Sequence, residues 1–325
     1  MGTWKTWLAA GIGGLALNLA CAAASAQAAD SADAQVERIV VPYAVGGITD
    51  LYGRVLAEQL QEGQKQSVLV DNRAGGGGAI GTAFVAKSKG DGRTLLLGSV
   101  GTATNPAMIK ALPYEPRDIV PVAQVAISPL ILYVRSGLPQ DLPGLIAYAK
   151  QEPGRMTFAN SGVGSSPNLA AALFARQLGL RVTHVSYRGT SAAINDFLGG
   201  QVDAYFDTAQ AMPHVQSGRI RAIAVAAPER LAEVPDLPTL DELGVRGVYA
   251  SSWWGIFVAA GTPQPVVQAL QSRLRQVVEN PVVKQRAADM GAVAIYRDQA
   301  AFRAFFDSEV ERWSAIIAAE KLSAQ

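Results

Sequence analysis

The chain has 325 residues, of which 49% are hydrophobic and 17% are charged, and its formal net charge is +1. This length is sufficient for two globular domains with their own cores, and the balanced charge argues against a nucleic-acid partner.

The N-terminal residues 1–28 have the features of a cleaved signal peptide. Lys5 is followed by an apolar run at 7–24 that is rich in Ala and Gly, and small residues between 24 and 28 form a cleavage pattern. We therefore expect export to the periplasm. A retained membrane anchor is disfavoured because the run is only weakly hydrophobic. A lipid anchor at Cys21 is disfavoured because Asn18 stands where such signals have leucine.

Cys21 is the only cysteine, and it lies within the predicted signal peptide. The exported chain would then have no disulfide, no thiol nucleophile and no cysteine metal site.

Short β-like runs alternate with helical patterns along the rest of the chain, which predicts parallel sheets covered by helices. The predicted strands are 39–41, 67–70, 94–98, 121–127, 130–134, 156–159, 182–185, 204–206, 220–226 and 255–259. The predicted helices are 50–60, 80–87, 142–151, 166–178, 191–198, 263–279, 281–290 and 300–319.

Two breaks in this alternation predict two α/β lobes. Turn-forming residues at 135–139 mark one boundary, and a second crossing is expected at 244–254, after a proline-rich loop. We expect lobe 1 to comprise 35–133 plus 250–325 and lobe 2 to comprise 134–249. Two crossings imply a hinge, with an inter-lobe cleft suited to a small ligand.

The stretch 39–60 reads as strand, glycine loop and helix. Gly46 and Gly47 allow the backbone to approach a ligand closely, and Thr49 and Asp50 are suitable helix caps. The free N–H groups of the helix start would face the loop, so the junction is suited to an anion or a polar head group.

Two more loops, 98–106 and 160–168, follow predicted strands and are rich in glycines and hydroxyls. Ser166 before Pro167 predicts a helix N-cap. Each loop alone is also compatible with an ordinary turn. Three such loops after strands favour one binding edge with many donors and few charges.

The run 76–81 has the spacing G-x-G-x-x-G, but the next predicted strand ends without the acidic residue that a dinucleotide site requires. A glycine-rich helix entry is the favoured interpretation. His184 and His214 are the only histidines and have no neighbours at metal-ligand spacing, and no G-x-S-x-G elbow is present. We therefore expect no catalytic residue, no metal and no cofactor.

Asp207 reads as a strand-flanking carboxylate that could receive a ligand ammonium or hydroxyl. Trp253 and Trp254 are compatible either with the wall of a cleft or with core packing, and the sequence leaves both interpretations open.

Taken in order, these motifs resemble the Bug family of extracytoplasmic solute receptors of tripartite tricarboxylate transporters. The resemblance runs from Glu37 to about Trp313. Its motifs lie at 41–43, 46–47, 50, 70–73, 75–78, 80–81, 105–106, 160–165, 185–189, 199–203, 238–239, 242 and 244.

The resemblance implies a two-lobed, type II periplasmic binding protein that closes over a small carboxylate, such as an amino dicarboxylate, a tricarboxylate or an aromatic acid. It also implies a monomer that presents this ligand to the permease subunits of a tripartite tricarboxylate transporter. The binding residues implied by the matched motifs are Gly46, Gly47, Ile48, Asp50, Ser99, Thr102, Asn105, Ser161, Gly162, Ser165, Asn168, Tyr187, Arg188 and Asp207.

Two residues depart from the family pattern. Val45 stands where the family usually has proline, and Asn168 stands where histidine is common. Two alternative functions remain: a ligand-sensing component of a signalling system, and a hydrolase on the same fold.

Overall fold

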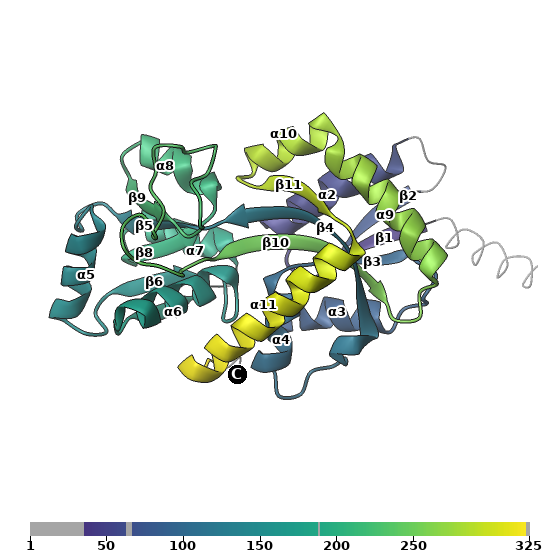
Figure 1. Cartoon of the computed structure of the whole chain (residues 1–325), viewed down its shortest axis with the longest axis horizontal. Coiled ribbons are helices and arrows are strands. Elements are labelled where there is room, and N and C mark those ends of the chain that lie inside the picture. The colour runs from purple at the N-terminus through teal and green to yellow at the C-terminus, as the bar shows by residue number, and fades with distance from the viewer. Residues whose placement is uncertain (1–35, 63–66, 188, 323–325) are drawn as a thin grey trace, which may run out of the picture.

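The computed structural model describes residues 36–62, 67–187 and 189–322 (Figure 1). The predicted signal peptide at 1–28 and the predicted site residue Arg188 lie outside the described residues.

The first of two sheets has six strands in the order β11-β4-β10-β3-β1-β2. Strand β1 pairs in parallel with β2 and β3, whereas β10 is antiparallel to β3 and β4, and β11 is antiparallel to β4. Its strands are β1 (Val36–Val41), β2 (Ser67–Asn72), β3 (Thr94–Gly98), β4 (Ile119–Pro129), β10 (Ser251–Ala259) and β11 (Val293–Arg297).

The second sheet has five strands in the order β7-β6-β8-β5-β9. Strand β6 is parallel to β7 and β8, and β5 is antiparallel to β8 and β9. Its strands are β5 (Ile131–Arg135), β6 (Thr157–Asn160), β7 (Thr183–Ser186), β8 (Ala204–Asp207) and β9 (Ile220–Val225).

Both sheets are therefore mixed. The predicted parallel pairing holds where a helix connects neighbouring strands, as a crossover requires. The antiparallel pairs involve β4, β5 and β10, which carry the chain between the two sheets (Figure 1).

The chain passes from the first sheet to the second at Leu130, between β4 and β5. The predicted turn residues near Ser136 directly follow β5, and β4 and β5 form one nearly continuous apolar run. The domain limits at 133/134 and 249/250 remain a prediction.

Ten α-helices lie in the described part of the chain. They are α2 (Ile48–Gln61), α3 (Ala79–Ala86), α4 (Val100–Met108), α5 (Leu142–Gln151), α6 (Ser166–Leu178), α7 (Thr190–Leu198), α8 (Met212–Gln216), α9 (Gln264–Glu279), α10 (Pro281–Asp289) and α11 (Gln299–Glu320). The sequence analysis did not predict α4, α8 or β11. Residues 98–106 were expected to form a loop, but they include most of α4.

One apolar core extends through both lobes on one side of the molecule. It joins Leu96 of the first sheet to Phe158 of the second through Trp253 of β10 and Trp313 of α11. Glu309 of α11 accepts hydrogen bonds from both indoles, at 2.9 Å from Trp253 Nε1 and 2.8 Å from Trp313 Nε1. Helix α11 packs against α4 of the first lobe and α6 of the second (Figure 1). The lobes are therefore joined along this side.

Candidate ligand-binding cleft

A cleft of about 1070 Å³ lies between the two lobes. One wall, which we call the first-lobe wall, consists of lining residues from 42–49, 74–78 and 99–108. The opposite second-lobe wall consists of lining residues from 161–167, 189–191 and 207–210. Ser252 and Trp254 of β10 line the cleft where the lobes join.

Five helices begin at the cleft walls. The residues that precede α2, α3, α4, α6 and α7 all line the cleft, and they are Gly47, Gly78, Ser99, Ser165 and Gly189. No side chain caps the starts of α2, α3, α6 and α7. Each helix start presents N–H groups and a partial positive charge, so these parts of the walls are suited to an anion without basic side chains.

The first glycine loop is held by Asp50 from within α2. The Gly46 amide donates a hydrogen bond to Asp50 Oδ2 at 2.9 Å, and Arg54 pairs with Asp50 Oδ1 at 3.0 Å. Burial works to raise the pKa of Asp50, but hydrogen bonds from the Gly46 amide and Arg54 outweigh it, so the pKa is lowered. Gly46 has φ of +84°, which other residues rarely adopt. Asp50 therefore shapes the loop, but it does not line the cleft.

The prediction that Thr49 and Asp50 cap α2 was wrong, because the helix already starts at Ile48 with Gly47 as its N-cap. Thr49 Oγ1 instead accepts a hydrogen bond from Trp254 Nε1 at 2.9 Å. The start of α2 is thus tied to β10, the strand that joins the lobes.

The second loop of the first-lobe wall packs against the glycine run 75–78. Asn105 Nδ2 donates to the Gly77 carbonyl at 3.1 Å, and a side chain at Gly101 would come within 2.6 Å of the same oxygen. Tyr43 and Ser99 share a hydrogen bond of 2.6 Å between their hydroxyl oxygens, and burial raises the pKa of Tyr43. These contacts explain why small residues predominate here.

Thr102 caps the start of α4 and does not face the cleft. Its Oγ1 accepts a hydrogen bond from the Ser99 amide at 3.2 Å, as in a capping box. Its side chain is buried, and Thr102 does not line the cleft.

On the second-lobe wall, Ser165 is the N-cap of α6, and Ser166 is the first helical residue, contrary to prediction. Ser165 Oγ donates to the Gly162 carbonyl at 2.6 Å, and the hydroxyls of Ser166 and Ser252 are 2.6 Å apart. The loop is thus fixed both internally and to β10.

Asn168 supports this loop from behind. Its Oδ1 accepts a hydrogen bond from the Gly164 amide at 3.0 Å, and its Nδ2 lies 3.3 Å from His184 Nδ1. His184 is on β7, as predicted, and burial lowers its pKa, which favours a neutral ring. Asn168 is buried and does not line the cleft.

Asp207 ends β8 and is 4% exposed. Its Oδ1 accepts a hydrogen bond from the Thr208 amide at 2.8 Å, whereas Oδ2 has no hydrogen-bond partner among the described residues. Burial raises the pKa of Asp207 to about 7, although the Thr208 amide and the Gln210 side chain act in the opposite direction. An unpartnered buried carboxylate oxygen is unfavourable in the ligand-free protein.

The structure brings most of the predicted site residues together. Those that line the cleft or its side pocket are Gly46, Gly47, Ile48, Ser99, Asn105, Ser161, Gly162, Ser165 and Asp207. Asp50, Thr102 and Asn168 lie behind the walls. Tyr187 does not line the cleft and packs in the apolar cluster around Tyr205.

Several lining residues were missed as ligand contacts. The glycine run 75–78 forms the predicted helix entry to α3, with positive φ at all four glycines, but it also lines the cleft. Thr190 and Ser191 begin α7, and Gln210 follows Asp207. Their position within three residues of a glycine or a strand end was the available signal. Trp254 lines the cleft, whereas Trp253 is fully buried in the core.

Within residues 36–62, 67–187 and 189–322, no group of three or more His, Cys, Asp or Glu side chains could hold a metal ion. No helix in the same described ranges is long and apolar enough to cross a membrane.

The two mixed α/β lobes and the cleft between them define the class of two-lobed solute-binding proteins. Residues 52–322 match the family TctC, described as "Tripartite tricarboxylate transporter family receptor". The chain belongs to this family, as its motifs predicted, and the family consists of solute-binding receptors, not enzymes.

The curated relative BugT of Bordetella pertussis is 35% identical over 294 residues, which cover 89% of this chain and 90% of the relative. The structure titled "Structure of periplasmic binding protein BugD" is 32% identical with a TM-score of 0.79, covering 89% of this chain and 99% of that chain. The Rhodopseudomonas palustris protein Rpa4515, solved with adipate, is 29% identical with a TM-score of 0.81, covering 89% of this chain and 98% of that chain. The predicted two-lobed fold and periplasmic binding-protein family are thus confirmed.

Proposed function

We propose that this protein is a periplasmic receptor, exported by residues 1–28, that captures a small carboxylate in the cleft between its lobes. Closure of the lobes then creates a shape that the membrane subunits of a tripartite tricarboxylate transporter recognise. The ligand favours the closed form because it contacts both walls only there.

The observation that carries this proposal is the set of five helix starts at the cleft. They offer backbone N–H donors and a positive potential, which is how proteins bind anions without basic side chains. None of the described residues lining the cleft is Lys or Arg. The adipate in the similar structure of Rpa4515 is a carboxylate, which supports the same ligand class.

The contacts of the first-lobe wall support a binding role for Gly46, Gly47 and Ile48. The loop around Gly46 is fixed before any ligand arrives, because Asp50 and Trp254 hold it from behind. A fixed loop loses little conformational entropy on binding, which favours affinity.

The proposal is tested by measuring the melting temperature of the mature protein with a panel of dicarboxylates, amino dicarboxylates, tricarboxylates and aromatic acids. A saturating ligand is expected to stabilise the fold by about 3 kcal/mol at a hundredfold excess over Kd. Uncharged amides of the same acids serve as controls and are expected to give no shift. If no carboxylate in the panel shifts the melting temperature, the proposal is wrong.

A further inference from the structure

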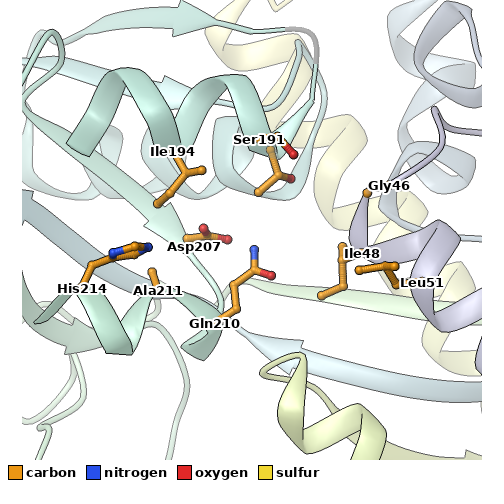
Figure 2. Close-up of a pocket in the computed structure, with 11 residues that line it drawn as sticks. Gly46, Ile48, Leu51, Ser191, Ile194, Asp207, Gln210, Ala211 and His214 are labelled. Atoms are coloured by element: carbon orange, nitrogen blue, oxygen red, sulfur yellow. The ribbon is translucent and has the colours of Figure 1, made fainter. Parts of the chain in front are cut away.

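A side pocket of about 260 Å³ adjoins the main cleft (Figure 2). On its first-lobe side lie Gly46, Ile48 and Leu51 of the first loop and α2, and Ile194 and Ala211 lie on the opposite side. Gly47, Ile48 and Asp207 line both spaces, so a ligand held at the first loop reaches the side pocket without leaving the cleft.

Asp207 is the acidic residue of this pocket. Figure 2 shows its carboxylate among Ser191, Ile194 and Gln210, facing the space between the lobes. Its Oδ2 atom is buried and has no hydrogen-bond partner among the described residues. Asp207 is only 4% exposed, so a charge on its carboxylate is poorly solvated without a ligand.

We propose that the side pocket is a cation subsite in which the Asp207 carboxylate accepts a hydrogen bond from a protonated amine of the ligand. The inference rests on the proposed carboxylate function and narrows its ligand class to amino carboxylates. The carboxylate lies at the helix starts of the first-lobe wall, and the ammonium group lies at the second-lobe wall.

The charges of the pocket favour an ammonium group over a second carboxylate. Asp207 carries the acidic side chain, and no Lys or Arg lines the pocket among the described residues. A second carboxylate beside Asp207 would require one of the two groups to take up a proton, because like charges in a buried site repel each other. An ammonium group instead supplies a counter-charge together with a strong hydrogen-bond donor.

The test uses ligand pairs that share a carbon skeleton and differ only in the amine. Isothermal titration at pH 8 compares aspartate with succinate, glutamate with glutarate, and 2-aminoadipate with adipate, for the wild type and Asp207→Asn. The control variant is Asp196→Asn, which removes the same charge from an exposed position of α7 that lines neither pocket.

In the wild type we expect the better-bound pair to favour its amino member by roughly 10- to 100-fold, as for one buried charged hydrogen bond. Asp207→Asn removes this preference, and Asp196→Asn retains it. If the diacids bind as well as the amino acids, or if Asp207→Asn keeps the preference, the inference is wrong while the carboxylate function stands. Binding of no carboxylate at all overturns both.

The pH dependence separates the two ligand types without any substitution. The titratable groups near Asp207 are Tyr205 of the same strand β8, Tyr133 of the neighbouring strand β5, and His214 of α8, which lines the same pocket. An amino ligand requires ionised Asp207, so its affinity rises from pH 6 to pH 8, whereas a diacid that needs protonated Asp207 weakens over the same range. Asp207→Asn is expected to remove the rise and Asp196→Asn to keep it, and a falling affinity of the wild type for the amino member contradicts the inference.

Discussion

The two walls of the cleft are polar in different ways. The first-lobe wall presents backbone amides at the starts of α2, α3 and α4. Asn105 in this wall and Asp50 behind it bond to the backbone of neighbouring glycine loops. The second-lobe wall also has two helix starts, but it adds a carboxylate with an unpartnered oxygen.

This difference between the walls suggests that the first-lobe wall supplies affinity for any carboxylate, whereas the second-lobe wall supplies selectivity among ligands. Backbone amides recognise any carboxylate, because every peptide unit offers the same donor. A buried side chain with an unpartnered atom discriminates strongly, since a ligand that leaves it unpaired loses the full desolvation cost. Substitutions in the first wall should therefore weaken all ligands, and those in the second should change ligand preference.

The largest effect is expected for Gly47→Val. The backbone at Gly47 has φ −78° and ψ 163°, and a Cβ there would lie 3.6 Å from the Ala44 carbonyl, so the fold tolerates a side chain. A branched side chain would fill the space in front of the α2 amides. We expect a loss of affinity of at least about 100-fold for every carboxylate, or about 2.7 kcal/mol.

The matched control for this experiment is Gly47→Ala, whose single methyl group makes an ordinary contact and should retain most of the affinity. Calorimetric titration measures both variants, and melting curves check that they fold. Normal binding by the folded valine variant would place the ligand elsewhere.

A smaller effect is expected for Asp50→Asn, which weakens the anchor of the Gly46 loop. The loss of a buried charged acceptor should lower the free energy of unfolding by about 2 kcal/mol at pH 7. Because the pKa of Asp50 is lowered below its ordinary 3.8, its contribution is present above pH 4 and is lost as the pH falls through the folded-state pKa.

Urea unfolding at pH 7 and pH 3 measures this contribution, and the difference between wild type and Asp50→Asn should shrink at the lower pH. Arg54→Ala is the control: Arg54 is half exposed, so its ion pair should contribute less than about 1 kcal/mol. Equal losses for the two variants would mean that Asp50 acts through Arg54 rather than through Gly46.

The smallest effect is expected for Asp207→Asn in the ligand-free protein, and it should be stabilising. The pKa of Asp207 is raised from 3.8 to about 7, so the folded protein holds the proton more tightly than the unfolded chain. Folding stability is therefore lost as the pH rises between these two values. The amide side chain introduced by Asp207→Asn does not ionise, so the variant does not show this loss. We expect a gain on the order of 1 kcal/mol at pH 8 and a smaller difference at pH 5.

Urea unfolding at both pH values, with Asp196→Asn as the reference, checks this gain. A variant that is less stable than the wild type at pH 8 would mean that the folded protein satisfies the charge of Asp207. The polar side chains of the second-lobe wall would then be satisfied within the protein, as those of the first-lobe wall are.

The apolar runs predicted the strands well, because most of the strands are largely buried and appear in the sequence as short, mainly apolar segments. Strand β11 escaped detection because Val293–Arg297 lies at the sheet edge, is only partly buried and alternates weakly. Helix α4 was missed because its glycine, hydroxyls and Pro106 are typical of a loop. The capping pair Ser99 and Thr102, together with packing against α11, decides in favour of the helix.

The site was predicted to the level of loops but not of individual roles. Glycines and strand ends locate the walls, so Gly47, Ser161 and Asp207 were correctly predicted to lie at the cleft, and their contact with a ligand stays a prediction. Whether a polar residue faces the cleft or braces a loop depends on tertiary contacts. Asn168 illustrates this limit, because its carboxamide is engaged by Gly164 and His184, which the sequence alone does not reveal.

Helix α11 holds the two lobes together along one edge of the cleft. Because it packs on α4 and α6 together, the edge of the cleft along these helices must move least when the lobes rotate. We expect the two lobes to rotate about the shared core along α11. Ligands of different length would then be enclosed at different rotation angles.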